Sequence, residues 1–238
     1  MNVKNLRLQK LMGVVVLGAL LSVACGPQQT SDNRKSVLST VHAESDDYSR
    51  ILKVGEVFPA SYNASKPTTS VVSQSDRDKD AAATAHTAYT PVACKDVDNL
   101  MAQLQDGERT TALNVQGDGQ VFIITAQSEV PDRHPVPAES SECTEFQIDS
   151  PGRYRGTVSR PKDTPDISGI QIRGYHTVAV TYNSGRTFEE YRYYAWLPNN
   201  RIVSVILVED SKNRAPGIAL DNSLAINALR KAVTEFGG

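Results

Sequence analysis

Apolar residues recur at helical spacing in several parts of the chain. Over 45–55 a serine and two aspartates precede the apolar positions, as the cap and first turn of a helix would. Over 94–104 the apolar residues stand three and four positions apart, and from about 216 to 236 they again follow a helical period. We therefore predict three helices, and a further one from the capping-box spacing of Ser75 and Asp78.

Between the second and the last of these segments the period changes to the alternation that is typical of β-strands. Alternating segments on both sides of Gly117-Asp118-Gly119 predict a hairpin over about 111–125. Further strands are expected over 154–159, 171–182, 187–197 and 202–208. The last two are apolar or aromatic on both faces, so we expect both faces of the sheet to be covered.

This order of elements predicts an α+β fold. We expect an antiparallel sheet of about five or six strands, built as a hairpin followed by a meander. Helices should flank the sheet, and they include an amphipathic helix at the C-terminus.

The first 24 residues have the pattern of a secretory signal peptide. Three basic residues precede the apolar stretch Leu11–Val23, which is shorter than the roughly 20 residues of a membrane-spanning helix. The stretch ends at Ala24-Cys25-Gly26, and small residues before a cysteine resemble the bacterial lipobox, in which the cysteine is diacylated. Cys25 is therefore predicted to carry a lipid, although Ser22 stands where the lipobox usually has Leu, Val or Ile. Ordinary signal cleavage after Ala24 is the alternative.

We accordingly predict a signal peptide over 1–24, a lipidated flexible tether over 25–44 and a single α+β domain over 45–238. The protein is expected to be exported and anchored by its lipid to the outer face of the cell membrane. If Cys25 is not modified, the protein is instead released outside the cell.

Charge and cysteine content narrow the class of protein further. The chain has a formal net charge of −2, and loss of the three basic residues in 1–24 changes this to −2 − 3 = −5. A domain of this charge is not expected to bind nucleic acid. Of the three cysteines, Cys94 and Cys143 are an even pair once Cys25 is acylated. In an exported chain we expect this pair to form one disulfide.

Several segments of the predicted domain carry a resemblance to a protein family. They are Val57-Phe58-Pro59, Pro91–Cys94, Gly117–Ile123, Cys143, Ile167–Ile170 and Glu189–Ala195. On these segments, over about residues 48–236, the chain resembles exported lipoproteins of mycobacteria and related actinobacteria that are built on a domain of unknown function. It is more weakly similar to the extracellular sensor domains of actinobacterial serine/threonine kinases, which have two disulfides. No activity follows from either resemblance.

The sequence contains no pattern for catalysis or metal binding. It has no G-x-S-x-G motif, its four histidines are scattered, and the acidic run Asp76–Asp80 lacks the glycine and final glutamate of a calcium loop. We therefore expect no enzyme activity, no catalytic residue, no metal and no cofactor. The expected function is that of a non-catalytic interaction or scaffold module, which holds an envelope protein near the membrane.

An aromatic cluster in the last strands motivates an alternative function. Tyr175, Tyr191, Tyr193 and Trp196 are the candidate residues of a cleft against the C-terminal helix. Such a cleft would bind a small apolar or glycan ligand of the envelope, and the protein would then be a carrier or sensor. In the other interpretation the same rings fill the core.

Overall fold

The computed structural model describes residues 46–95, 97, 104–130, 140–210 and 219–237, which belong to the compact unit Lys35–Gly238. The predicted signal peptide and tether, with Cys25, lie outside the described residues. Within the described ranges, no helix is both long and apolar enough to cross a membrane.

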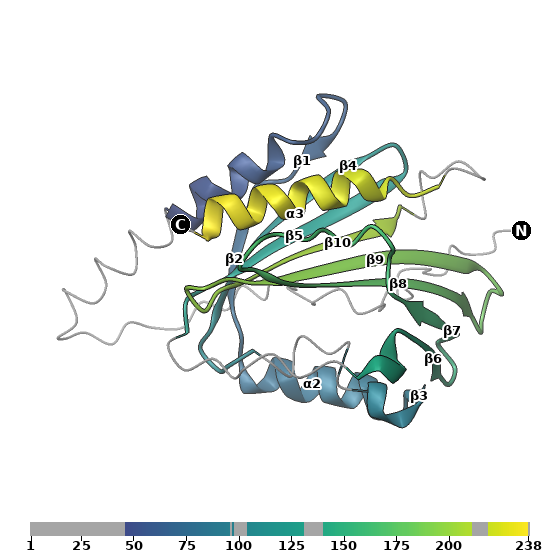
Figure 1. Cartoon of the computed structure of the whole chain (residues 1–238). Coiled ribbons are helices and arrows are strands. Elements are labelled where there is room, and N and C mark those ends of the chain that lie inside the picture. Colours follow the sequence, from purple (N-terminus) through teal and green to yellow (C-terminus); the bar gives the residue numbers. More distant parts are fainter. Residues whose placement is uncertain (1–45, 96, 98–103, 131–139, 211–218, 238) are drawn as a thin grey trace, which may run out of the picture. The chain divides into compact units, whose positions relative to one another are not determined.

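The strands form one antiparallel sheet. In chain order they are β1 (Asn63–Ala64), β2 (Thr68–Val71), β3 (Ala88–Thr90), β4 (Arg109–Gly117), β5 (Gln120–Gln127), β6 (Glu145–Ser150), β7 (Tyr154–Ser159), β8 (Gln171–Thr181), β9 (Thr187–Trp196) and β10 (Ile202–Glu209). Their order in the sheet is β1-β4-β5-β10-β9-β8-β7-β6-β3, and β2 also pairs with β4 (Figure 1). Each strand of the hairpin and of the meander therefore lies beside a partner that runs in the opposite direction.

The α+β class and the antiparallel sheet are confirmed, but the predicted number of strands is wrong, because the described residues alone contribute ten strands to the sheet. Three of the missed strands, β1, β2 and β3, are two to four residues long and mostly exposed, so they carry no apolar alternation. The fourth, β6, does alternate, but it has only Phe146 and Ile148 as buried apolar residues. The three short strands β1, β2 and β3 are stabilised by pairing with a neighbouring strand and leave little signal in the sequence.

Two helices pack on the same face of the sheet. One covers residues 46–55, as predicted, and the other is α3 (Asn222–Phe236), which lies beside it (Figure 1). The start of α3 is later than the predicted residue 216, because the side chain of Asp221 caps the helix by accepting from the amides of Ser223 and Leu224. We call this side of the sheet the helix face.

The third helix, α2 (Gln74–Thr84), begins one residue before the predicted Ser75 and has a different cap. Ser73 is the N-cap residue, and it forms a capping box with Asp76. This box lowers the pKa of the Asp76 carboxyl, chiefly through the hydrogen bonds from Ser73. No residue of α2 is buried, so this helix adds little to the core. Most of the helix predicted over 94–104 lies outside the described residues.

The helix face holds the larger of two apolar cores. The buried side of α3 consists of Ala225, Ala228, Leu229, Ala232, Val233 and Phe236. These residues pack with Ile51 and Val54 of the first helix against apolar side chains of β4, β5, β9 and β10. Full burial of each larger aliphatic or aromatic side chain contributes about 1.5–3 kcal/mol, so this layer supplies much of the free energy of folding.

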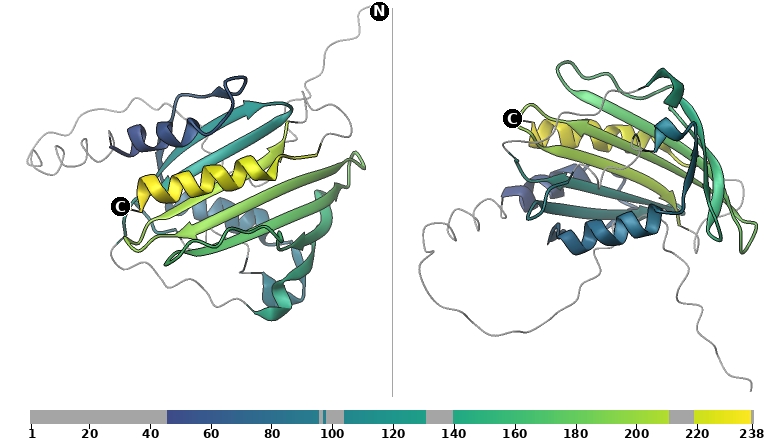
Figure 2. Two further views of the ribbon diagram at one scale, coloured as in Figure 1. Left: turned by 45° about the horizontal axis from the view of Figure 1, so that its top comes forward. Right: turned by 90° about the horizontal axis from the view of Figure 1, so that it is seen from below.

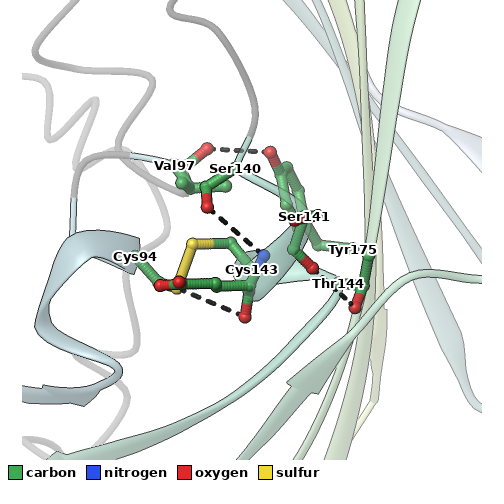
Figure 3. Close-up of a disulfide and its surroundings, with 8 residues drawn as sticks. Cys94, Val97, Ser140, Ser141, Cys143, Thr144 and Tyr175 are labelled. Atoms are coloured by element: carbon green, nitrogen blue, oxygen red, sulfur yellow. Dashed lines mark hydrogen bonds between the residues drawn. A yellow bond between two sulfur atoms is a disulfide. The ribbon is translucent and has the colours of Figure 1, made fainter.

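The second core lies on the opposite face and contains the predicted disulfide, Cys94–Cys143 (Figure 3). Both cysteines are buried, at the ends of the short 3-10 turns η1 (Val92–Cys94) and η3 (Ser141–Cys143). Beside them the Tyr175 hydroxyl donates a hydrogen bond of 2.8 Å to the carbonyl oxygen of Val97. We call this side of the sheet the disulfide face.

The outer strands β7, β6 and β3 turn away from the central strands, toward the side on which α2 lies (Figure 1). A close approach of two backbones accompanies this bend. A Cβ atom on Gly156 would lie 2.2 Å from the carbonyl oxygen of Val178 and 2.5 Å from the Cα atom of Ala179. Only glycine fits at this point of β7 without displacing β8.

We predict that Gly156→Ala destabilises the domain by about 3 kcal/mol, because the added methyl group must push β7 and β8 apart. The neighbouring change Thr157→Ala affects the other side of the same strand and is expected to cost less than about 1 kcal/mol. Urea unfolding followed by circular dichroism measures both. Equal midpoints for the two variants would contradict this account of the bend.

We also predict that Cys94→Ala with Cys143→Ala lowers the free energy of unfolding by up to about 4 kcal/mol. The disulfide closes a loop between residues 49 positions apart, and its loss increases the entropy of the unfolded chain. The control is Cys25→Ser, which leaves this pair intact. If the double variant and the control unfold at the same urea concentration, the disulfide does not stabilise the fold.

Candidate functional site

Part of the helix face is not covered by any described helix. The helix α3 packs on β10, β9 and β5. The strands farther out in the sheet, from β8 to β6, lie to one side of this helix (Figure 2, left). The strand register places twelve side chains on this uncovered surface, which we call the open face. They are Glu145, Gln147, Asp149, Arg155, Thr157, Ser159, His176, Val178, Val180, Tyr182, Thr187 and Glu189.

An apolar row runs along the open face on the second half of β8 and the residue after it. Val178, Val180 and Tyr182 alternate along the chain and therefore point to the same side. Their relative exposures are 42%, 38% and 44%, and they are three of the six exposed large apolar residues in the described part of the chain. Single exposed apolar residues are ordinary, whereas a contiguous row on one surface marks a candidate interaction site.

The outer end of the row is held by polar contacts. The Tyr182 hydroxyl donates a hydrogen bond of 2.8 Å to Asp149 Oδ1 on β6. This bond to a carboxylate raises the pKa of Tyr182. The guanidinium group of Arg155 on β7 lies 5.9 Å from the centre of the Tyr182 ring. The ring is therefore bracketed by an acid and a base from the two neighbouring strands.

The inner end of the row meets a cluster of aromatic and acidic side chains. The rings of His176 and Tyr191 are stacked, with centroids 4.2 Å apart and planes inclined by 10°. Nε2 of His176 lies 2.9 Å from Glu189 Oε1. Burial, with smaller contributions in the same direction from the carboxylates of Glu189 and Asp163, raises the pKa of Tyr191 to about 12. Tyr191 is therefore a neutral phenol at physiological pH.

Next to this cluster, a chain of hydrogen bonds links β9 to the start of α3. Tyr193 donates a bond of 2.8 Å to Asn222 Oδ1, and Asn222 Nδ2 donates one of 2.8 Å to Asp163 Oδ2. The part of β9 that borders the open face is thus bonded to the helix that covers the core. Within the described ranges, no group of three or more His, Cys, Asp or Glu side chains is arranged to hold a metal ion.

The four residues predicted to line a cleft lie on two opposite faces of the sheet. Tyr175 and Trp196 belong to the core of the disulfide face, whereas Tyr193 is fully buried on the helix face with Tyr191 packed beside it. The cause is the alternation along β9, which sends odd and even positions to opposite sides. The structure therefore does not bring the four side chains together, because the sheet lies between the two pairs.

The disulfide face also contains charged groups that the sequence analysis did not single out. The guanidinium group of Arg173 lies 5.3 Å from the centre of the Trp196 ring. Next to it on β9, Glu190 and Arg192 form an ion pair of 2.6 Å with both side chains mostly buried. Their alternation with apolar residues resembles a solvent-facing pattern, so burial of these charges could not be read from the sequence.

The open face, too, was missed by the expectation that both sheet faces are covered. That expectation holds for β10, where Val205 and Ile206 are both buried. It fails on β8, where the successive apolar residues Val178, Ala179 and Val180 are exposed, buried and exposed. Apolar residues on both alternations of 171–182 were the available signal, but they do not reveal which side lacks a cover.

Comparison with known proteins gives a family and a related fold. Residues 47–236 match the family model described as Domain of unknown function (DUF5642). The X-ray structure of an uncharacterized protein from Mycobacterium smegmatis, the Rv0999 ortholog, is similar, with a TM-score of 0.60 and 21% sequence identity. The match covers 81% of this chain and 97% of that chain, and at this identity it shows the shared fold.

Comparison with curated protein sequences finds no match. The two findings above confirm the resemblance to a mycobacterial domain of unknown function, and they do not test lipidation. Because the family model spans nearly all of the described domain, the chain belongs to the DUF5642 family of domains of unknown function.

Proposed function

We propose that this protein is a non-catalytic interaction module of the cell envelope and that its partner docks on the open face. The observation that carries the proposal is the exposed row of Val178, Val180 and Tyr182 on a sheet surface that no described helix covers. Docking would remove this apolar surface from water, which contributes about 25 cal/mol per Å². The polar side chains around the row would form the rim of the interface.

The position of the domain's first helix supports docking at the open face, because the tether would join the domain away from this surface. Asp47, near the start of the described chain, forms an ion pair of 2.8 Å with Arg201 in the turn between β9 and β10. The apolar row lies toward the opposite end of β9, where β8 turns into it. A tether over 25–44, lipidated at Cys25, would therefore join the domain far from the outer end of the row.

We further propose that the protein acts outside the cytoplasmic membrane, anchored to its outer face or released. The disulfide Cys94–Cys143 supports export, because such bonds persist in oxidising compartments. The lipid anchor rests on the sequence around Cys25 alone.

The carrier or sensor function is a second candidate, and one observation favours the disulfide face for it. There the guanidinium group of Arg173 lies over the ring of Trp196, and the centre of the Tyr194 ring is 6.1 Å from that of Trp196. Aromatic rings beside a buried cation suit a small ligand with an apolar and an anionic part. Native mass spectrometry of the exported protein, followed by lipid extraction, separates the two functions, since a carrier would retain a defined added mass.

We predict that a photo-crosslinking residue, p-benzoylphenylalanine, in place of Val180 forms a discrete protein adduct in the living host. The side chain at this position is 38% exposed within the apolar row, so it would lie inside the interface. The control is the same residue in place of Val71, which is 56% exposed on the edge strand β2. Denaturing gels after irradiation give the readout. Absence of an adduct from position 180, or the same adduct from position 71, would contradict the proposed function.

A further inference from the structure

We propose that the partner of the open face is a basic protein segment that carries its own apolar stripe. This inference rests on the proposed function, and it adds the chemistry of the partner.

The open face is acidic. Glu145 and Asp149 are exposed on β6, and Glu189 lies on β9 in contact with His176. Arg155 is the one Arg or Lys among the twelve residues that define the face. With His176 neutral, the formal charge of the face is therefore 1 − 3 = −2. The guanidinium group of Arg155 lies over the ring of Tyr182.

The basic residues that lie near the open face do not change the negative sign of its charge. Arg186, in the turn after β8, forms an ion pair of 3.1 Å with Glu209 of β10. Arg153, before β7, donates a hydrogen bond to the carbonyl oxygen of Ala83 in α2, away from the open face. The segment 160–170 contains two bases and two acids, which cancel.

This charge decides between the occupants that an apolar sheet surface could accept. Anionic lipid headgroups and nucleic acid would meet a surface of the same sign. A second copy of this chain, docked face to face, would bring together two faces of −2 and a combined charge of −4. A basic protein segment, by contrast, gains favourable charge contacts in addition to burial of the apolar row.

The spacing of the groups sets the pattern that the partner needs. The row of Val178, Val180 and Tyr182 extends about 13 Å, at roughly 6.6 Å for every second residue of a strand. Glu189 lies on the next strand to one side of the row, with about 5 Å between the strand backbones. Glu145 and Asp149 lie on the second strand to the other side, with about 10 Å between the backbones. Long basic side chains on both sides of an apolar stripe would reach these carboxylates.

The test neutralises the acidic rim in the protein that carries the photo-crosslinker at position 180. Glu145→Gln with Asp149→Asn removes two charges and keeps an oxygen that can accept from Tyr182. The matched control is Glu56→Gln with Asp106→Asn, which removes the same charge from acids outside the open face. We expect about fivefold less adduct from the rim variant than from the control. The crosslinked peptide, sequenced by mass spectrometry, should hold more Lys and Arg than Asp and Glu.

Three outcomes would overturn the inference while the proposed function stands. They are an unchanged adduct in the rim variant, an equal loss in the rim variant and the control, and a crosslinked peptide without excess basic residues. An adduct to lipid or to a second copy of this chain would also overturn it, in favour of a membrane surface or self-association. If the protein with an unaltered rim forms no adduct at all, the proposed function itself fails.

Discussion

The two helices on the helix face are together narrower than the ten-stranded sheet that they pack on. The rest of the structure depends on this difference in width. Strands stand about 4.8 Å apart and a helix with its side chains is about 10 Å wide, so two helices side by side cover about four strands. The four strands are β4, β5, β10 and β9, which supply the sheet side of the larger core. Ile172 near the start of β8 packs against the core, whereas the helix-face side of β7, of β6 and of the second half of β8 is left open. Its surface has to be polar or find a partner from outside, and along β8 it is apolar.

On the disulfide face, the outer strands are covered by a bend of the sheet and not by helices. There β7, β6 and β3 turn toward the turns that carry Cys94 and Cys143, so the outer strands close over a second core (Figure 1). The absence of a side chain at Gly156 permits the close approach of β7 and β8 that accompanies the bend. One side of these outer strands is thereby buried against the disulfide, and the other side is turned outward. The open face is thus a consequence of how the second core is built.

Much of this architecture is predictable from the sequence, and the predictions that were wrong have identifiable physical causes. The alternation over 187–197 fixes which residues of β9 share a face, and the cysteine count predicts the disulfide. The cap of α2 could not be chosen from sequence, because Ser73–Asp76 and Ser75–Asp78 fit the capping box equally well. Tertiary contact decides: the amide of Val72 bonds the carbonyl oxygen of Glu108 at 2.7 Å, which holds the chain extended up to Ser73.

The candidate site was harder to predict than the fold for a related reason. Alternation shows that Tyr191 and Tyr193 lie opposite Trp196, but it does not show which strands a helix reaches. The uncovered part of a sheet depends on the width of its covering layer, and that width is set by elements distant in sequence. Val178 and Val180 therefore look like core residues until the position of α3 is known.

The apolar row is also prepared for binding by its own neighbours. A valine side chain has few favourable rotamers, so Val178 and Val180 lose little conformational entropy when a partner covers them. Tyr182 would lose more, but its hydroxyl is already bonded to Asp149 and its ring lies under Arg155. At the inner end, His176 is stacked on Tyr191 and contacts Glu189. A rigid apolar surface between fixed polar groups costs less to order on docking than a mobile one. The arrangement therefore favours association more than its modest area alone would suggest.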